Sequence, residues 1–581
     1  MAKTNSMKNL ITIFLLFVTL GLTAQNREKA FEINEKLGRG INYGNMFEAP
    51  SETAWGNPWK PEYAGIISGL GFNHVRIPIR WEPTDRSLAT PPYTIYSTFL
   101  NRIKQVVDSA LNNGLYAIIN MHHHEALYEN PEAQKDRFVA QWKHISEFFK
   151  NYPDSLLFEL MNEPHGNLTP EKWNEFYPEV LDSIRIDNPE RIVLIGTPEY
   201  GGLSGLPYIE IPDDENIILT VHYYNPFQFT HQGAEWSGEQ SQEWLGTEWL
   251  DTETEREVMR QEFAPLKAYE IQHNIPVHIG EFGAYDKAGM KSRARWTTFL
   301  SRYLEELGWS WAYWEFSAGF GIYNPSNNTF YNELVDALLH NEMPEPGRYV
   351  GTPVYTSHFQ TGNDGWSLNA QQGASAQLTR ANNTLNIGIS NPGTAGWHVQ
   401  LQRGNISLQA GKKYRCSFKA KADATRSMTS YIGMSGDPWS AYSGYNGVTL
   451  ADTFAVYTFI FDANTTDNTA RMVFDIGNSD INISVTDIKI EEVTFQPPTG
   501  VFEMEQPHLN IYPNPVKNRL FFSHTGEFDR VAVFNIQGRP VLENPVRETD
   551  NNLDVSALQS GIYLIRFSGK DKTVTKKFIK R

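Results

Sequence analysis

The chain has 581 residues, enough for several domains, and its 40% hydrophobic and 20% charged residues are typical of a globular protein. Its formal net charge of −17 argues against nucleic-acid binding, which needs clustered Lys and Arg. The acidity suits a neutral substrate, and it equally serves to keep a secreted protein soluble. The single cysteine, Cys416, excludes an intrachain disulfide, and we expect it to be a buried strand residue rather than a nucleophile.

Residues 1–24 have the pattern of a signal peptide. Lys3 and Lys8 precede an apolar run over residues 10–22, and small residues stand just before Gln25. The run is too short for a comfortable membrane span, and no later segment approaches the length of one. We therefore expect a secreted chain that begins near Gln25 and has no membrane span in its mature form.

Apolar runs alternate with amphipathic stretches from about residue 36 to residue 339. The runs predicted as strands are 38–45, 73–80, 115–121, 156–162, 191–196, 216–224, 275–281 and 309–315. Several are almost continuously hydrophobic, which is typical of parallel strands buried on both faces. Stretches predicted as helices include 98–112, 134–151, 171–188 and 293–307. This alternation predicts an α/β fold, a (β/α)8 TIM barrel over residues 25–346.

The pattern changes after Pro346. Short alternating segments at 414–420, 455–461 and 481–493 are separated by Gly, Asn and Asp turns. They predict an antiparallel β-sandwich over residues 351–495. A Pro-rich linker is predicted over 496–507, and a small C-terminal β-sandwich domain, with strands near 531–535, 563–567 and 573–579, over 508–581.

Two glutamates stand where predicted strands meet their loops, Glu163 after the fourth strand and Glu281 at the end of the seventh. In such a barrel the chemistry lies at the carboxyl ends of the strands, and these two strands face each other across the mouth. Glycoside hydrolysis needs two carboxyl groups, one a protonated acid and the other a nucleophile or a base. Glutamates follow strands by chance as well, but two of them within apolar strands favour catalysis.

Other side chains at the strand ends fit this chemistry. An arginine and a tyrosine near Glu281 would keep it ionised, whereas burial near His222 is expected to keep Glu163 protonated at neutral pH. Asn162 is expected to hydrogen-bond the sugar 2-hydroxyl, and Trp314 offers a ring face to the sugar.

Three consecutive histidines, His122, His123 and His124, raise the alternative of a zinc site, as in a metal-dependent esterase or deacetylase. Neighbouring strand residues point to opposite faces, so all three cannot meet one ion, and no His-Glu-x-x-His motif is present. We therefore expect no catalytic metal and no organic cofactor, and we expect these histidines to hydrogen-bond sugar. Chelators would stop the metal-dependent enzyme and not the two-glutamate one.

The strand-end motifs together resemble glycoside hydrolase family 5, the cellulase and mannanase group of retaining barrel enzymes. The matching stretches are 38–42, 74–81, 120–123, 160–174, 222–227, 231–236, 279–285 and 309–316. They occur in order along the barrel, and they are most similar to endoglucanases of the family that also act on mannans.

This resemblance implies that Glu163 is the acid/base and Glu281 the nucleophile of a double displacement, with carboxyl groups about 5–5.5 Å apart. Supporting catalytic roles are implied for Arg76, Asn162, His222 and Tyr224. Substrate contacts are implied for Asn45, Glu48, Pro78, His122, His123, His231, Trp236, Trp314 and Phe320. His124 stands where relatives can carry an aromatic residue.

The two C-terminal regions have resemblances of their own. The sandwich resembles carbohydrate-binding modules of the β-jelly-roll type, with Trp439 and Tyr442 as sugar-binding candidates. Further rings considered as exposed candidates are Trp366, Trp397 and Tyr445, and each of these aromatics is equally plausible as a core residue. Residues 508–581 resemble the type A sorting domain of type IX secretion on the motifs 511–515, 535–538, 553–556 and 561–564, which implies contact with the secretion machinery.

The sequence therefore predicts a secreted retaining endo-β-1,4-glycanase that hydrolyses β-1,4-glucan such as cellulose or mixed-linkage β-glucan, and possible further substrates are mannan and glucomannan. The alternatives are a β-mannanase, a xyloglucanase or a non-catalytic carbohydrate-binding protein, the last of which would need a lost carboxylate. The expected partners are the polysaccharide and the secretion machinery, with no nucleic acid among them.

Overall fold

The computed structural model describes residues 26–498, 509, 511–522, 528–535, 539–547, 551–569 and 573–581. The predicted signal peptide at residues 1–24 and most of the predicted linker at 496–507 lie outside the described residues. Internal contacts divide the chain into two compact units, Met1–Glu345 with Thr499–Arg581, and Pro346–Pro498.

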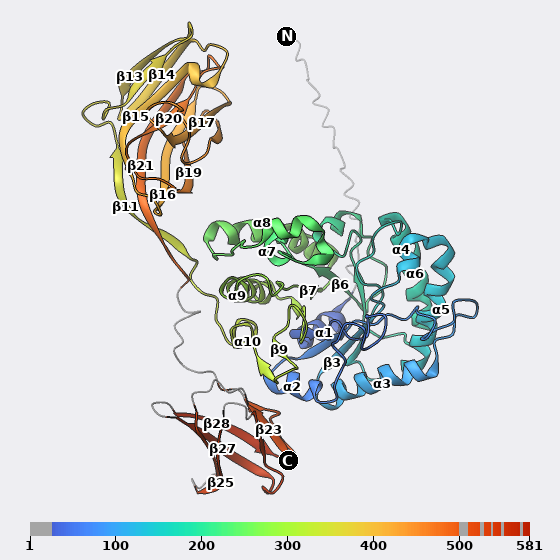
Figure 1. Cartoon of the computed structure of the whole chain (residues 1–581). Helices are drawn as coiled ribbons and strands as arrows, with labels where there is room; N and C mark the ends of the chain where they lie inside the picture. Colours follow the sequence, from blue (N-terminus) through green and yellow to red (C-terminus); the bar gives the residue numbers. More distant parts are fainter. Residues whose placement is uncertain are drawn as a thin grey trace, which may run out of the picture. The chain divides into compact units, whose positions relative to one another are not determined.

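Eight parallel strands close into a barrel in chain order (Figure 1). Their bounds are β1 (Arg39–Asn42), β2 (His74–Ile77), β3 (Tyr116–Asn120), β4 (Leu156–Glu159), β5 (Val193–Gly196), β6 (Ile217–His222), β7 (Val277–Glu281) and β8 (Ser310–Tyr313). Nearly every strand residue is buried, because one face fills the barrel and the other packs against helices. The predicted (β/α)8 barrel is confirmed, with strands shorter than the predicted apolar runs.

Helices surround the barrel and, in the case of α1, close one of its ends (Figure 1). They are α1 (Glu28–Leu37), α2 (Tyr63–Leu70), α3 (Ser97–Asn112), α4 (Glu125–Glu129), α5 (Pro131–Phe149), α6 (Pro170–Asp187), α7 (Phe227–Thr230), α8 (Glu253–His273), α9 (Met290–Glu306) and α10 (Asn332–Leu339), with a small hairpin of β9 (Tyr323–Asn324) and β10 (Thr329–Phe330) between α9 and α10. In α6 the residues Trp173, Phe176, Val180 and Ile184 are all buried, as their helical spacing requires.

The α1 helix closes one end of the barrel. It ends directly before β1 begins, so it lies at the amino end of the sheet. Its residues Ala30, Ile33 and Leu37 share a hydrophobic cluster with buried residues of β3 to β6. The carboxyl ends of the strands, which carry the predicted site residues, lie at the opposite end of the barrel.

The second unit is an antiparallel β-sandwich, as predicted. One sheet has the order β13-β14-β21-β16-β19, with β11 paired to β21, and the other has the order β12-β15-β20-β17-β18. The bounds are β11 (Arg348–Ser357), β12 (Ser367–Ala370), β13 (Ser375–Ala381), β14 (Thr384–Asn391), β15 (Val399–Leu408), β16 (Lys413–Ala422), β17 (Arg426–Gly433), β18 (Asn446–Leu450), β19 (Ala455–Asp462), β20 (Asp467–Asp475) and β21 (Ile483–Gln496). Cys416 is buried in β16, which confirms its predicted structural role.

The C-terminal region is also built of antiparallel strands, with sheet orders β22-β23-β26 and β25-β24-β27-β28. The bounds are β22 (Ile511–Tyr512), β23 (Arg519–Phe522), β24 (Arg530–Asn535), β25 (Pro540–Pro545), β26 (Asn552–Asp554), β27 (Gly561–Ser568) and β28 (Thr573–Lys580). The residues 536–538 of its predicted sorting motif lie outside the described residues. Within the described parts of the chain, no helix has the length and apolarity that a bilayer crossing requires.

Candidate active site

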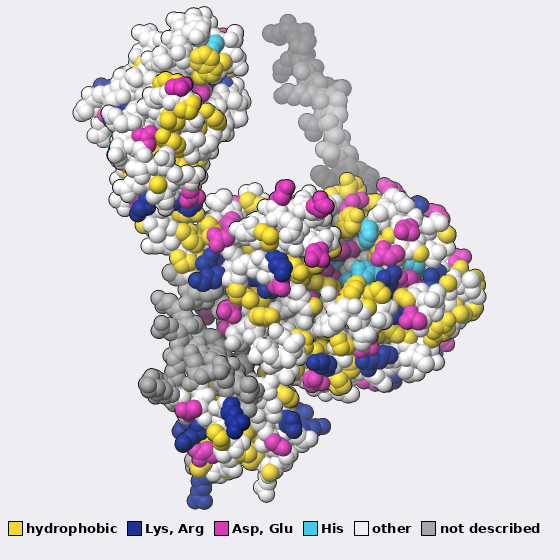
Figure 2. All heavy atoms as spheres, viewed as in Figure 1, with side chains coloured by type: hydrophobic (Ala, Val, Ile, Leu, Met, Phe, Trp, Pro, Cys, Tyr) yellow, Lys and Arg dark blue, Asp and Glu magenta, His cyan; other side chains and the backbone are white. Residues whose placement is uncertain are grey.

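A cavity of ≈ 790 Å³ opens among the loops that follow the barrel strands. Figure 2 shows histidine side chains in a hollow of the barrel surface, with acidic side chains around it. The residues predicted from the sequence that line this cavity are Asn45, Glu48, His122, His123, Asn162, Glu163, Tyr224, His231, Trp236, Glu281, Trp314 and Phe320. Further lining residues that the sequence analysis did not single out are Trp55, Glu235, Tyr285 and Gly319.

The other predicted site residues are Arg76, His222 and Pro78. Arg76 and His222 are buried behind the cavity wall, and they hydrogen-bond to Glu281 and Glu163 respectively. Pro78 is buried directly after β2 and does not line the cavity. The structure thus gathers the predicted charged residues into one site and places Pro78 outside its wall.

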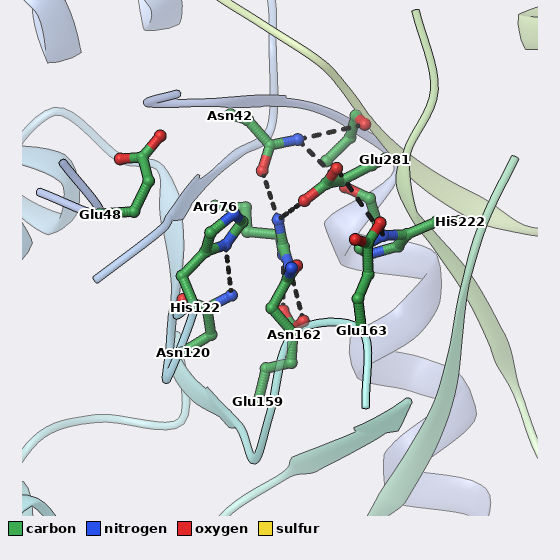
Figure 3. A network of polar contacts seen from close by, with 12 residues as sticks. Asn42, Glu48, Arg76, Asn120, His122, Glu159, Asn162, Glu163, His222 and Glu281 are labelled. Atoms are coloured by element: carbon green, nitrogen blue, oxygen red, sulfur yellow. Dashed lines mark hydrogen bonds and ion pairs between the residues drawn. The ribbon is translucent and has the colours of Figure 1, made fainter. Parts of the chain in front are cut away.

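Arg76 is the centre of a buried polar network (Figure 3). Its Nε and Nη2 donate to the two carboxylate oxygens of Glu159 at 2.6 and 2.7 Å. Its Nη1 donates to Glu281 Oε1 at 2.6 Å and to Asn42 Oδ1 at 2.9 Å, and Nη2 also donates to Asn162 Oδ1 at 2.8 Å. Because all five guanidinium N–H groups are used, Arg76 fixes the Glu281 carboxylate and the Asn162 amide relative to each other.

Glu159 is a buried residue behind the site, and the sequence analysis gave it no role. It is the last residue of β4 and is fully buried, where an unpaired carboxylate would be very costly. Its bidentate pair with Arg76 supplies the compensating charge. The sequence carried a signal for this pair, because Glu159 is the one charged residue of the run 156–161, and a buried acid needs a buried cation.

The two predicted catalytic carboxyl groups lie close together. Glu281 is the last residue of β7, and its Oε2 accepts a hydrogen bond from the Tyr224 hydroxyl at 2.9 Å. Glu163 lies beyond the end of β4 with φ of 45°, a left-handed backbone that non-glycine residues adopt only uncommonly. An oxygen of Glu163 and an oxygen of Glu281 lie within 4.8 Å of each other.

His222, the last residue of β6, contacts both carboxyl groups (Figure 3). Its Nδ1 lies 2.7 Å from Glu163 Oε1 and 3.7 Å from Glu281 Oε2. Burial acts to lower the pKa of His222, but the charge of Glu281 and the contact with Glu163 outweigh it, and the pKa is raised. The proton between Glu163 and His222 therefore has a favourable position on the imidazole.

Burial acts to raise the pKa of Glu163, but the hydrogen bond and charge of His222 outweigh it and bring the pKa below its ordinary value. The expectation that burial near His222 keeps Glu163 protonated is therefore wrong in direction, because the contact with His222 lowers the pKa of Glu163 more than burial raises it. Burial is also the largest influence on Glu281, whose pKa is raised although His222 and Arg76 act to lower it. Burial raises the pKa of Tyr224 well above its ordinary value, so its hydroxyl remains a donor to Glu281.

The three consecutive histidines diverge. His122 stacks on Trp314 with ring centroids 5.5 Å apart, and His123 lines the cavity beside it. The Nδ1 atom of His124 accepts a hydrogen bond from the Leu127 N–H at the start of α4. Burial lowers the pKa of all three side chains, so at neutral pH they act as neutral hydrogen-bonding groups.

Glu315 shapes the cavity from behind, and the sequence analysis gave it no role. Its fully buried carboxylate accepts hydrogen bonds from the backbone N–H groups of Ser317, Ala318 and Phe320 at 2.7, 2.8 and 3.1 Å. Burial raises the pKa of Glu315 to about 7. These bonds fix the loop that places the Phe320 ring in the cavity wall.

One group of described residues brings three metal-ligating side chains together, namely Glu163, His222 and Glu281. The guanidinium of Arg76 lies 2.6 Å from Glu281 and would repel a cation held there. The Nδ1 atom of His222 is also already bonded to Glu163. The donor set therefore fits acid–base chemistry better than metal binding.

A second cavity, of ≈ 870 Å³, lies on the sandwich. The rings of Trp397, Trp439 and Tyr445 line it and are 45%, 49% and 65% exposed. Its polar lining includes Gln400, Gln402, Tyr431, Arg471 and Asp475. We call this cavity the sandwich groove.

The sandwich groove includes only part of the predicted aromatic set. Trp439 lines it, and the Arg471 guanidinium lies 4.5 Å from the centroid of that ring. Tyr442 instead packs against the hydrophobic core and donates its hydroxyl to Asp467 at 2.9 Å. Trp366, for which an exposed and a core position are equally plausible from the sequence, is 3% exposed and packed in the core.

A parallel (β/α)8 barrel with two facing glutamates at the carboxyl ends of β4 and β7 is an architecture of glycoside hydrolases. Residues 40–319 match the family described as Cellulase (glycosyl hydrolase family 5), and the chain belongs to this family. Residues 353–480 match the family described as Carbohydrate binding domain, and residues 510–581 match the Secretion system C-terminal sorting domain. All three resemblances inferred from the sequence are thereby confirmed.

Several curated relatives share the barrel. Endoglucanase H of Acetivibrio thermocellus is 37% identical over 326 residues, which are 55% of this chain and 34% of that protein. The chain thus spans about a third of the length of that relative. Endoglucanase A of Ruminococcus albus is 30% identical over 348 residues, which are 54% of this chain and 92% of that protein.

Solved structures of Thermotoga maritima Cel5A are also similar to the barrel. The complex with mannotriose is 47% identical with a TM-score of 0.52, and the match covers 53% of this chain and 99% of that one. A structure described as a complex with cellobiose is 48% identical with the same TM-score and coverage.

Proposed function

We propose that this chain is a secreted endo-β-1,4-glucanase that cleaves β-1,4-glucan by double displacement, with Glu281 as nucleophile and Glu163 as acid/base. The observation that carries the proposal is the opposed carboxyl pair, with oxygens within 4.8 Å of each other. Inverting enzymes keep their carboxyl groups about 6.5–9.5 Å apart to admit a water, so the short separation supports direct attack by a carboxylate. The names of the endoglucanase relatives support the glucan substrate.

In the first step, Glu281 attacks the anomeric carbon and the glycosidic C–O bond breaks. Glu163 gives a proton to the leaving oxygen, and the imidazolium of His222, 2.7 Å away, supplies that proton through the shared hydrogen bond. Arg76 and Tyr224 orient the Glu281 carboxylate by their hydrogen bonds at 2.6 and 2.9 Å. The product is a glycosyl ester of Glu281 and a free sugar with its hydroxyl restored.

In the second step, water attacks the anomeric carbon of the ester and Glu163 accepts its proton. The charge of Glu163 raises the pKa of Glu281, so the two carboxylates repel each other. Ester formation removes the Glu281 charge and therefore lowers the pKa of Glu163, which suits it to act as a base. Breaking the ester bond then restores the Glu281 carboxylate and releases a sugar of retained configuration.

Mannan is the second candidate substrate. The Cel5A structures with cellobiose and with mannotriose support a site of this shape that accommodates either sugar. Glu48 lines the cavity with a buried carboxyl group whose two oxygens accept the backbone N–H groups of Asn45 and Met46, and burial raises its pKa to about 8.

We further propose that the sandwich groove binds a glycan chain between its exposed rings, and that the C-terminal region directs export through type IX secretion after a signal peptide at residues 1–24. The exposed Trp397, Trp439 and Tyr445 support the first assignment. The match of residues 510–581 to a sorting domain supports the second.

Reducing-sugar release tests the proposed activity. The full chain and its Glu281→Gln variant are incubated with carboxymethylcellulose, mixed-linkage β-glucan, glucomannan, mannan and xylan. We expect release from the glucans that the variant abolishes, and the mannan result then gives the breadth of specificity. No release of reducing sugar from any of the polymers, or activity that persists in Glu281→Gln, would contradict the proposed activity or the role of Glu281 as nucleophile.

A further inference from the structure

We propose that Tyr128 is a positioning residue for Glu163 and that, together with His165, it fixes the two peptide groups on either side of this acid/base. This inference rests on the proposed function. Tyr128 belongs to α4, which follows β3, whereas Glu163 follows β4, so the contact joins two loops. The Tyr128 side chain is 4% exposed and lies outside the wall of the main cavity, so it acts through Glu163 and not on the sugar.

The Tyr128 hydroxyl is aimed at the backbone carbonyl of Asn162. The two oxygens are 2.8 Å apart, and the hydroxyl also lies 3.2 Å from the His122 carbonyl. Because the hydroxyl carries one hydrogen, the shorter contact takes it. Burial and the charge of Glu163 raise the pKa of Tyr128 well above its ordinary value, so the hydrogen stays in place at neutral pH. The bond therefore holds the peptide group that precedes Glu163.

His165 holds the peptide group that follows Glu163. The Glu163 carbonyl oxygen can only accept, so the His165 Nδ1 atom, 2.6 Å away, carries a hydrogen and donates it. The Tyr128 ring packs against the His165 ring with centroids 4.0 Å apart, and the Tyr128 carbonyl accepts the Asn167 N–H at 2.9 Å. The two side chains thus support each other, and we call Tyr128 and His165 the acid clamp.

The backbone of Glu163 explains why such a clamp is needed. Its φ of 45° is left-handed, a conformation that costs a non-glycine residue energy and persists where the surrounding contacts hold it. Rotation about the N–Cα bond turns the preceding peptide group, and rotation about the Cα–C bond turns the following one. Each hydrogen bond of the acid clamp restrains one of these rotations. Together they fix the direction of the Cα–Cβ bond and hence the position of the carboxyl group.

That position determines how well the acid works. Glu163 Oε1 lies 2.7 Å from the His222 Nδ1 atom, and the same carboxyl group must reach the leaving oxygen in the first step. A displacement of about 1 Å can cost about 10²-fold in rate. The nucleophile Glu281 is held separately, by Arg76 and Tyr224. Loss of the acid clamp should therefore weaken the acid more than the nucleophile.

Two substrates with the same sugar and different leaving groups test this role. Phenyl β-cellobioside needs a proton on its leaving oxygen, whereas 2,4-dinitrophenyl β-cellobioside needs little. In full-length Tyr128→Phe, the ratio of kcat/KM on the phenyl compound to kcat/KM on the dinitrophenyl compound should fall about tenfold relative to wild type. Tyr177→Phe is the matched control, because Tyr177 is a buried tyrosine of α6 whose hydroxyl donates to the Glu210 carbonyl, away from the site. Its ratio should stay within about twofold of wild type.

The other half of the acid clamp gives a second readout. His165→Ala should lower the same ratio about tenfold. His165→Asn should restore it to within about threefold of wild type, because the amide nitrogen of Asn can donate from nearly the position of Nδ1. These two variants decide the matter if Tyr128→Phe does not fold.

Equal losses on the two cellobiosides in Tyr128→Phe would overturn the positioning role, because they would indicate a general structural effect. An unchanged ratio in Tyr128→Phe or in His165→Ala would overturn it as well, and so would a loss in His165→Asn as large as that in His165→Ala. A wild-type chain inactive on both cellobiosides and on cellopentaose would instead overturn the proposed function, and the positioning role with it.

Discussion

Replacing Glu159 by Gln tests the network behind the nucleophile. The change keeps the size of the side chain but removes the charge from an ion pair whose side chains are 0% and 1% exposed. Breaking a buried pair costs about 3–5 kcal/mol. At about 2–4 °C per kcal/mol for a large domain, the melting temperature of the barrel should fall by roughly 10 °C. Glu305→Gln is the matched control, because Glu305 forms a similar bidentate pair with Arg39 at the partly exposed surface.

The same variant should change the pH dependence of catalysis. Without the Glu159 charge, the positive field of Arg76 acts more strongly on Glu281, so the pKa of Glu281 should fall. Profiles of kcat/KM against pH on an aryl β-cellobioside report this value, because they follow the free enzyme. The acid limb should move to lower pH in Glu159→Gln and stay in place in Glu305→Gln. An acid limb that is unchanged or moves upward in Glu159→Gln would refute the reasoning.

Other predictions follow from the two catalytic carboxyl groups and the sandwich groove. Wild-type kcat/KM should depend on pH in a bell shape. Activity should fall on the acid side as Glu281, whose pKa is raised, becomes protonated, and on the alkaline side as His222, whose pKa is also raised, loses its proton. A flat profile between pH 4 and 9 would contradict the transfer of a proton from His222 through Glu163. In Glu163→Gln, kcat/KM should fall about 10²–10⁴-fold on cellopentaose. It should fall much less on 2,4-dinitrophenyl β-cellobioside, whose leaving group needs little protonation, and equal losses on both substrates would argue against the role of Glu163 as acid. Trp439→Ala should weaken the retention of the full chain in a gel containing soluble β-glucan about tenfold. Hydrolysis of an aryl β-cellobioside should not change. Unchanged retention would show that Trp439 does not bind the glycan. Incubation with EDTA should leave hydrolysis intact, whereas activity lost to EDTA and restored by zinc would favour a metal at Glu163, His222 and Glu281.

The barrel could be predicted from the sequence because its signal is local. Strands buried on both faces are predominantly apolar, and that pattern located all eight. The ends of the strands were less accurate, since the predicted run 156–162 continues apolar beyond the last paired residue, Glu159. Hydrophobicity records burial and not hydrogen-bond register, so it could not show where β4 stops.

The site was predictable where residue type and strand end sufficed, as for Glu163 and Glu281. The roles of Glu159 and Glu315 depend on partners distant in sequence or on loop geometry, such as Arg76, which is separated from Glu159 by 83 positions. The direction of the pKa shift of Glu163 also depends on geometry, because the 2.7 Å contact with His222 lowers this pKa more than burial raises it. In the sandwich, aromatic type alone could not tell the buried Trp366 from the exposed Trp439.

Trapping the intermediate tests the central claim most directly. The full chain is incubated with 2,4-dinitrophenyl 2-deoxy-2-fluoro-β-cellobioside, and its peptides are then analysed by mass spectrometry. The fluorine slows both the formation and the hydrolysis of the glycosyl ester. The good leaving group restores the rate of formation alone, so a glycosyl-enzyme should accumulate. We expect the added fluorocellobiosyl mass on the peptide that contains Glu281, and no addition in Glu281→Gln. An active enzyme that acquires no label, or a label on another residue, would contradict the proposed mechanism.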